Sequence, residues 1–163
     1  MLGIRTSAGR LTTNVTEINR ENLVADENAL HDFNHGVVQE FRANGGKVGG
    51  PFEGGDLLLL HTTGAKSGQP RISPLAYLTV DGKMIIVGSY AGAPKDPAWV
   101  HNLRANPQAR IEVGTEAYDV DVRELPPAER EAAYPAIIEV APVFAEYQAK
   151  TTRQIPLFEL IRA

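Results

Sequence analysis

The sequence predicts one domain of the α+β or mostly β class, a barrel of antiparallel strands with helices around it. Three observations indicate this fold class. Strand-like runs follow one another through the middle of the chain, tight turns join two pairs of them, and segments with helical spacing lie around them. A length of 163 residues is enough for one hydrophobic core.

The first helix is expected from Asp26 to about Ala43, after a polar N-terminal extension, Met1 to Ala25, that is expected to be poorly ordered. Four apolar residues recur at helical spacing and define one face of this helix: Leu30, Phe33, Val37 and Phe41. We expect this face to pack on the barrel. Docking on a membrane is the weaker alternative, because acidic residues outnumber the single Arg42 along the helix.

Neither a metal site nor a dinucleotide site is expected in this part of the chain. His31 and His35 have the spacing of a zinc-binding helix, but the acid beside them is Asp32 rather than glutamate and no clear third ligand follows. The stretch from Asn44 to Gly55 is rich in glycine and lacks the G-x-G-x-x-G spacing of a dinucleotide-binding turn. We expect solvated histidines and a flexible connection.

The central part of the chain is expected to form an antiparallel sheet. Leu57 to Leu60 is a short apolar run of strand length. Tight turns predict two hairpins: Asp81-Gly82 joins Ile72–Val80 to Lys83–Ser89, and Gly114-Thr115 joins Ala109–Val113 to Glu116–Leu125. A last strand, Ile155 to Ile161, is expected to close the sheet.

Three further helices are expected. Asp96 as N-cap and Pro97 in the first turn begin one of about three turns, which Asn106-Pro107 ends. Pro126-Pro127 opens a second helix through Val140, broken or kinked at Pro135. A third helix spans Val143 to Lys150.

The loop from Thr62 to Pro74, T-T-G-A-K-S-G-Q-P-R-I-S-P, places two cations, several hydroxyls and two glycines between two strands. Lys66 and Arg71 supply positive charge, and the glycines let the backbone approach a ligand closely, so the composition is that of an anion site. A surface loop whose cations keep a sheet edge soluble is the alternative. A Walker loop is excluded because Ala65 stands where that motif requires glycine.

A second block, G-S-Y-A-G-A-P-K-D-P-A-W-V-H-N-L-R-A-N-P, runs from Gly88 to Pro107 and is expected to pass from a strand end through a loop into a helix. The helix N-terminus offers N–H groups and a positive dipole end to that loop, reinforced by Lys95. Trp99 and Leu103 are spaced to share one helix face. For Trp99, packing in the core and contact with a ligand are both open alternatives.

Three motifs in this order, L-L-L-x-T-T-G-x-K-S-G-x-P-R-x-x-P-L, G-S-x-x-G-x-x-K-D-P-x-W and N-L-x-A-N-P, make the chain resemble the deazaflavin-dependent nitroreductase and quinone reductase family. The resemblance covers about Glu27 to Ile161. It implies a split β-barrel over residues 26–163 and the cofactor F420, a deazaflavin with a phosphodiester and a polyglutamate tail. The implied activity is hydride transfer from reduced F420 to a quinone-like, nitroaromatic or other conjugated electrophilic acceptor.

The resemblance also implies where the cofactor binds. Lys66, Ser67 and Arg71 would take the phosphate and nearby carboxylates, backbone groups of two strand segments would contact the deazaflavin ring, and one helix would close a side of the channel. The implied cofactor-binding residues are Ala65, Lys66, Ser67, Arg71, Ile72, Ser73, Pro74, Leu75, Ala76, Val87, Gly88, Ser89, Tyr90, Lys95, Ala98, Trp99, Val100, His101 and Asn102.

The acceptor side is expected along the C-terminal helical segment. There Tyr134, Phe144 and Tyr147 offer flat apolar walls to a planar substrate, and the alternative is that they seal the barrel. Nitroimidazole-reducing relatives carry a tyrosine where this chain has Phe144, which implies weaker activity on nitroimidazoles. No catalytic acid-base pair is expected, because the hydride chemistry belongs to the cofactor.

Composition limits the partners and the location. With a formal net charge of -4 the chain is a poor general nucleic-acid binder. It has no cysteine, no apolar run long enough to cross a bilayer and no secretion signal, so the expected location is the cytoplasm. Family members that reduce menaquinone are membrane-associated, so peripheral contact with the inner face of the cell membrane stays open, as does the choice between monomer and homodimer.

Three other functions stay open: an FMN-dependent reductase on the same barrel, a non-enzymatic F420 carrier, and an interaction barrel without a cofactor. The FMN enzyme would not need a basic site for an anionic tail, and the carrier would lack an open acceptor face. A hydrolase is not expected, because Ser67, Ser73 and Ser89 lack the G-x-S-x-G elbow.

Overall fold

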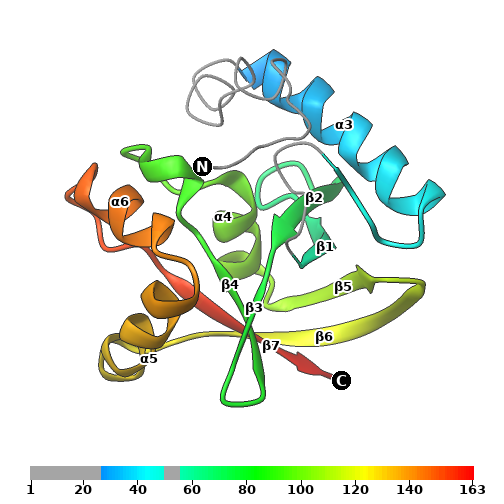
Figure 1. Ribbon diagram of the computed structural model, residues 1–163. Helices are drawn as coiled ribbons and strands as arrows, with labels where there is room; N and C mark the ends of the chain where they lie inside the picture. The colour runs from blue at the N-terminus through cyan, green and yellow to red at the C-terminus, as the bar shows by residue number, and fades with distance from the viewer. Residues whose placement is uncertain (1–26, 50–55) are drawn as a thin grey trace.

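The computed structural model describes residues 27–49 and 56–163, and the expected extension, Met1 to Ala25, lies outside them. Within this described part, seven antiparallel strands form one curled sheet, and four α-helices lie around it (Figure 1). In chain order the elements are α3 (Glu27–Ala43), β1 (Leu57–Thr63), β2 (Pro70–Ala76), β3 (Leu78–Val80), β4 (Lys83–Val87), the 3-10 turn η2 (Tyr90–Gly92), α4 (Ala98–Ala105), β5 (Gln108–Val113), β6 (Glu116–Glu124), α5 (Pro127–Val140), α6 (Val143–Ala149) and β7 (Leu157–Arg162).

The sheet closes on itself because of the order of its strands, β2-β1-β5-β6-β7-β4-β3. β2 and β3 are its two edges, yet they are consecutive in the chain and only Tyr77 separates them. An extended residue spans at most about 3.6 Å, so the facing ends of the two edges lie within about 7 Å. The sheet is therefore a split β-barrel, as expected.

The expectation of one strand from Ile72 to Val80 is wrong. The segment forms β2 and β3, which lie at opposite edges of the sheet. The break falls at Tyr77, whose N–H still donates to the carbonyl of Asp56, just before β1, in the register of the β1–β2 ladder (3.1 Å); the chain leaves β1 after this residue. Both halves have strand composition, so the local sequence gives no sign that the chain passes from one edge of the sheet to the other at this point.

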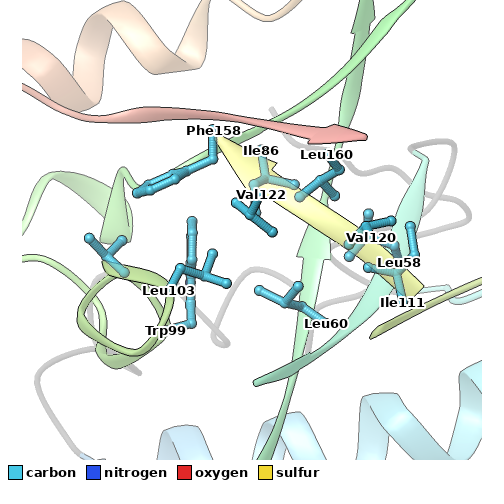
Figure 2. Packing of buried hydrophobic residues seen from close by; sticks show 11 residues of the cluster. Leu58, Leu60, Ile86, Trp99, Leu103, Ile111, Val120, Val122, Phe158 and Leu160 are labelled. Atoms are coloured by element: carbon cyan, nitrogen blue, oxygen red, sulfur yellow. The ribbon is translucent and has the colours of Figure 1, made fainter. Parts of the chain in front are cut away.

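The barrel interior is filled by alternate residues of the strands. Leu58 and Leu60 of β1 point inward, where they meet apolar side chains of β4, β5, β6 and β7 and one face of α4. Figure 2 shows Trp99 and Leu103 of α4 reaching toward Phe158 of β7 in this cluster. The helix thus fills one end of the barrel core.

The outer faces of two strands are also covered. Leu57 and Leu59, which alternate with the inward residues of β1, pack against Val37 and Phe41 of α3. On the other side of the barrel, α5 covers β4 and β7 through Ile137. The expectation that the apolar face of α3 packs on the barrel is confirmed by this cluster.

Most other elements match the expected ones within a few residues. The turns at Asp81-Gly82 and Gly114-Thr115 join β3 to β4 and β5 to β6, as expected. α5 runs through Pro135 as one helix. The expected N-cap role of Asp96 is wrong: α4 begins after Pro97 without a side-chain cap, because the Asp96 carboxylate binds two arginines instead.

Within residues 27–49 and 56–163, no helix combines the length and the apolarity that crossing a membrane requires. In the same residues no group of three or more His, Asp or Glu side chains is arranged to hold a metal ion. His31 and His35 are both exposed on α3.

Candidate functional site

The loop between β1 and β2 is a compact turn with two outward cations. The Gly64 N–H donates to the Gln69 carbonyl (2.8 Å), and the Gly68 N–H donates to the Gly64 carbonyl (3.0 Å). A Cβ added at position 64 would lie 2.5 Å from the Ser67 hydroxyl and 3.3 Å from the Gln69 carbonyl oxygen, so any other residue there would displace the Ser67 side chain. Lys66 and Arg71 are exposed. The turn therefore displays two cations on a fixed backbone.

Asn102 of α4 fixes this loop to the barrel. Its side-chain oxygen accepts a hydrogen bond from the Ala65 N–H (2.8 Å), and its amide nitrogen donates to the hydroxyl of Thr62 (3.1 Å). Asn102 and Thr62 are both buried, each 6% exposed. Buried polar groups contribute most when all of them are paired. The position of the loop between β1 and β2, residues 64–69 and here called the Lys66 loop, is thus coupled to α4.

The segment after β4 contains a left-handed turn. Tyr90, Ala91 and Gly92 have φ values of 47°, 55° and 81°, three consecutive residues in a region that only glycine adopts easily. For Tyr90 and Ala91 this conformation costs about 1 to 2 kcal/mol each. Gly92 is required for space as well, since a Cβ there would lie 2.9 Å from the Tyr147 carbonyl oxygen of α6. Such strain persists only where surrounding contacts hold it.

Arg153, which precedes β7, supplies those contacts. Its Nη1 and Nη2 donate to the carbonyls of Gly88 (3.1 Å) and Ser89 (2.8 Å) before the turn, and its Nε donates to the carbonyl of Ala93 after it (2.9 Å). Nη1 also binds Asp96 at 2.7 Å. The side chain of Arg153 is 16% exposed, and this burial lowers the pKa of Arg153 while Asp96 opposes the shift.

Asp96 extends this network to α4 and β6. Its second carboxylate oxygen pairs with Arg104 of α4 (3.1 Å), and Arg104 forms a two-pronged ion pair with Glu124 of β6 (2.9 and 2.8 Å). The hydrogen bonds with Glu124 raise the pKa of Arg104. The left-handed turn, α4 and β6 are thereby joined by charged side chains.

The two faces of α4 have different roles. Trp99 and Val100 are buried in the barrel core, and the Trp99 ring meets Phe158 edge-on at 5.6 Å. Ala98 and His101 are exposed. For Trp99 and Val100 the structure favours packing over contact with a ligand, so the helix presents mainly Ala98 and His101 to a neighbouring molecule.

The remaining expected cofactor residues lie on β2 and at the end of β4. β2 is an edge strand, so one row of its backbone groups faces away from β1. Along it Ile72 and Ala76 are exposed, Ser73 and Leu75 are half-buried and Pro74 is buried. At the end of β4, Gly88 packs so closely on Val100 and Pro156 that a Cβ would approach both to 2.9 Å.

The expected acceptor-side residues are half-buried where α5 meets α6. Tyr134 donates from its hydroxyl to the Phe144 carbonyl (3.2 Å), and its ring lies under the Arg130 guanidinium at 4.5 Å. Burial raises the pKa of Tyr134. Phe144 and Tyr147 meet edge-on at 6.1 Å. Tyr134 is thus engaged in holding α5 to α6, while α6 itself lies against the left-handed turn.

The structure brings these parts together at one end of the barrel. Asn102 joins the Lys66 loop to α4, Gly88 joins the end of β4 to α4, and α6 contacts the left-handed turn (Figure 1). Arg153 was not expected from the sequence, because its partners are backbone carbonyls 60 to 65 residues away. A lone arginine in a polar segment carries no local signal of such a role.

Two surface hollows lie elsewhere and are not assigned to this site. The larger, of about 740 Å³, is at the other end of β1 between α3 and the β5–β6 turn, and its walls include Gly49 and Asp56, which flank residues 50–55. The smaller, of about 270 Å³, lies over β4, β6 and β7. Neither is lined by the Lys66 loop or the left-handed turn.

Comparison with known proteins gives the site a context. The model of a family described as F420H(2)-dependent quinone reductase matches residues 35–161. An F420H(2)-dependent quinone reductase from Mycobacterium tuberculosis is 36% identical over 128 residues, which cover 75% of this chain and 85% of that protein.

Two solved structures are similar to this chain at 42% sequence identity, each with a TM-score of 0.57. One, described as an F420-H2 dependent reductase, aligns over 64% of this chain and 93% of its own. The other, described as a domain-swapped dimer, aligns over 64% of this chain and 79% of its own.

Proposed function

The chain belongs to the F420H(2)-dependent quinone reductase family, and on this premise we propose that it reduces a quinone-like acceptor with electrons from reduced F420. The family match covers residues 35–161, which run from within α3 to all but the last residue of β7. A quinone becomes a hydroquinone by taking up one hydride and one proton. Reduced F420 supplies the hydride when it is bound.

The residues of the site fit an anionic, flat cofactor. The observation that carries the proposal is the Lys66 loop: two exposed cations on a turn that Asn102 fixes to α4. Lys66, Ser67 and Arg71 would hold a phosphate and carboxylates by charge-assisted hydrogen bonds. β2, as an edge strand, offers unpaired backbone groups to the ring of the cofactor. Because the loop before β2 is fixed, its cations keep a constant position relative to these backbone groups.

On the acceptor side we infer that α6 forms one wall. Phe144 and Tyr147 form an edge-on aromatic pair there, and α6 contacts the left-handed turn that follows β4. Aromatic rings suit a planar acceptor. The Tyr134 hydroxyl already donates to the Phe144 carbonyl, so solvent or Tyr147 is the better source of the proton.

The binding experiment is calorimetric titration of the purified protein with F420 and with FMN. F420 should bind and FMN should bind roughly tenfold or more weakly, because FMN has no polyanionic tail for the two cations of the loop. FMN that copurifies and cannot be displaced by F420 would contradict the proposal and favour an FMN-dependent reductase.

Turnover separates an enzyme from a carrier. Under anaerobic conditions the protein should oxidise reduced F420 with menadione or another soluble quinone. Tight F420 binding without oxidation by any quinone, nitroaromatic or unsaturated carbonyl compound would favour the carrier instead.

Phe144 predicts the preference among acceptors. Turnover with a quinone should exceed turnover with a bicyclic nitroimidazole, and Phe144→Tyr should raise the nitroimidazole rate about tenfold or more, because a donor aimed at developing negative charge can contribute a few kcal/mol. The measurement is the anaerobic rate with both acceptors for both proteins. Equal rates in the unmodified protein would contradict this role of Phe144.

A homodimer is the assembly we propose. It is supported by the similar solved structure described as a domain-swapped dimer, at 42% identity. Light scattering behind a size-exclusion column gives the mass directly, and a mass near 17.7 kDa at all concentrations would contradict it.

A further inference from the structure

Arg153 contacts the backbone on both sides of the left-handed turn, and it does so from a segment that is distant in the sequence. It binds the carbonyls of Gly88 and Ser89 ahead of Tyr90–Gly92, and the carbonyl of Ala93 behind it. We propose that Arg153 is a positioning residue, which sets the backbone N–H groups of Ser89 and Tyr90 toward the ring of the cofactor. This inference rests on the proposed function, since it assigns a partner to the same site.

The direction of these N–H groups follows from peptide geometry. In a planar trans peptide the C=O and the N–H point in opposite directions. The Gly88 and Ser89 carbonyls point at the Arg153 guanidinium, so the N–H groups of the same two peptides, which belong to Ser89 and Tyr90, point away from it. A deazaflavin ring carries carbonyl oxygens that can accept such hydrogen bonds.

Because the turn is left-handed, the direction of the Ser89 and Tyr90 N–H groups depends on the bonds that Arg153 makes. Tyr90 and Ala91 hold a backbone conformation that residues with a side chain rarely adopt. The turn is held by two hydrogen bonds of its own, from the Gly92 N–H to the Ser89 carbonyl (2.9 Å) and from the Ala93 N–H to the Tyr90 carbonyl (3.0 Å). The three carbonyl bonds of Arg153 and the packing of Gly92 on α6 add to them. Without the guanidinium only the bonds within the turn and the packing of Gly92 remain, so we expect the turn to open more often and the two peptides to rotate.

Only arginine can make these contacts together. Its planar fork binds three carbonyls and Asp96 at once, and a lysine ammonium is a single point that cannot span them. Asp96, itself held by Arg104, binds Nη1 of the same fork. The site therefore distinguishes arginine from lysine by geometry rather than by charge.

The test compares Arg153→Gln and Arg153→Lys with Arg110→Gln. Arg110 lies on β5, is half exposed and pairs with the exposed Asp119, so the control removes the same charge without touching the turn. Three quantities are measured: hydrogen exchange of the peptide covering residues 87–97 without cofactor, the Kd for F420, and kcat for menadione reduction with reduced F420. Thermal melting gives the folded fraction of each variant.

We expect Arg153→Gln to exchange about tenfold faster in residues 87–97 and to lose about tenfold in kcat, with a Kd within about threefold of the control, because Lys66 and Arg71 still hold the tail. Arg153→Lys should lie much closer to Arg153→Gln than to the unmodified protein. Two further variants, Arg153→Ala and Lys66→Ala, test rescue: guanidinium ion at millimolar concentration should restore part of kcat to the first and not to the second.

Unchanged exchange and unchanged kcat in Arg153→Gln would overturn the inference. So would a lower melting temperature with unchanged exchange in residues 87–97, because Arg153 would then stabilise the fold without setting the turn. Failure of the unmodified protein to bind F420 would overturn the proposed function, and the positioning role with it. The exchange measurement, made without cofactor, would then still decide whether Arg153 holds the turn.

Discussion

Lys66 and Arg71 are exposed, so their removal should affect ligand binding far more than folding. Toward the residues that the structure describes, the hydrogen bonds of Arg71 are long, 3.4 Å to the Pro70 carbonyl and 3.4 Å to the Ser67 hydroxyl. Charge-assisted hydrogen bonds contribute about 1.5 to 3 kcal/mol each. Lys66→Ala or Arg71→Ala should therefore weaken F420 binding roughly ten- to a hundredfold in calorimetry.

The melting temperature of both variants should stay within about 2 °C of the unmodified protein, since substitutions of exposed residues have small effects. Arg110→Gln is again the matched control for charge. A Kd unchanged in both Lys66→Ala and Arg71→Ala would mean that these cations do not bind the cofactor and only keep the sheet edge soluble.

Trp99 shows how burial decides between two roles that the sequence left open. It is 6% exposed and meets Phe158 edge-on, so Trp99→Phe should leave a small cavity in the barrel. We expect a loss of about 1 to 2 kcal/mol, less than the about 3 to 5 kcal/mol of truncation to alanine, and a melting temperature lower by about 2 to 8 °C. F420 affinity should remain within about twofold. A weaker affinity with an unchanged melting temperature would place the indole in the ligand site.

At the scale of elements, α3 is held to the sheet by charge as well as by its apolar face. The Arg42 guanidinium binds both carboxylate oxygens of Glu112 on β5 (3.2 and 2.7 Å), and the same carboxylate meets the His61 ring of β1 at 2.5 Å. The hydrogen bond from Arg42, supported by His61, holds the pKa of Glu112 below its usual range, although burial opposes the shift.

Because the pKa of Glu112 is depressed in the folded protein, the contribution to stability is complete above the ordinary glutamate pKa of about 4.3 and is lost as the pH falls through the folded value. Glu112→Gln should therefore be less stable than the unmodified protein at pH 7, by about 1 kcal/mol, and the difference should shrink below about pH 4. Thermal melting of both proteins from pH 3 to 7 measures it. Glu116→Gln, an exposed change in the same hairpin, is the control; a difference independent of pH would contradict the ion pair.

Sequence reasoning found the elements where local chemistry specifies them. The hairpin turns are marked locally by Asp81-Gly82 and Gly114-Thr115, and the helix periodicity of α3 is visible in its own residues. It failed where a distant partner decides. The split of Ile72–Val80 into two edge strands depends on barrel closure, and Asp96 leaves its cap position because Arg153, 57 residues away, attracts it.

The candidate site divides in the same way. The two cations and the block from Gly88 to Pro107 are contiguous in the sequence and could be singled out there. The hydrogen bonds of Asn102 to the β1–β2 loop and those of Arg153 around the left-handed turn could not be derived, because each set joins segments that only the fold brings together. Each residue binds backbone groups as well as one side chain, and backbone groups, which every residue possesses, leave no trace in composition.

At the scale of the whole molecule, β7 connects the two halves of the sheet. It lies between β6 and β4, and β4 has only β3 on its other side. Deletion of residues 157–163 would remove Leu157, Phe158 and Leu160 from the core and leave the β3–β4 hairpin without a partner. An isolated hairpin is marginal in water, so we expect no cooperative melting and an unfolded far-UV circular dichroism spectrum. Deletion of residues 161–163 alone, which are exposed, is the control and should still melt cooperatively.

The position of β7 also has a consequence for biosynthesis. β7 follows every other strand in the sequence, yet it is paired on both sides. During translation, β4 and β6 therefore leave the ribosome with unpaired edges and must wait for the strand that lies between them. Unpaired strand edges are templates for association between chains. Until residues 157–162 have emerged, these two edges are therefore open to pairing with other chains.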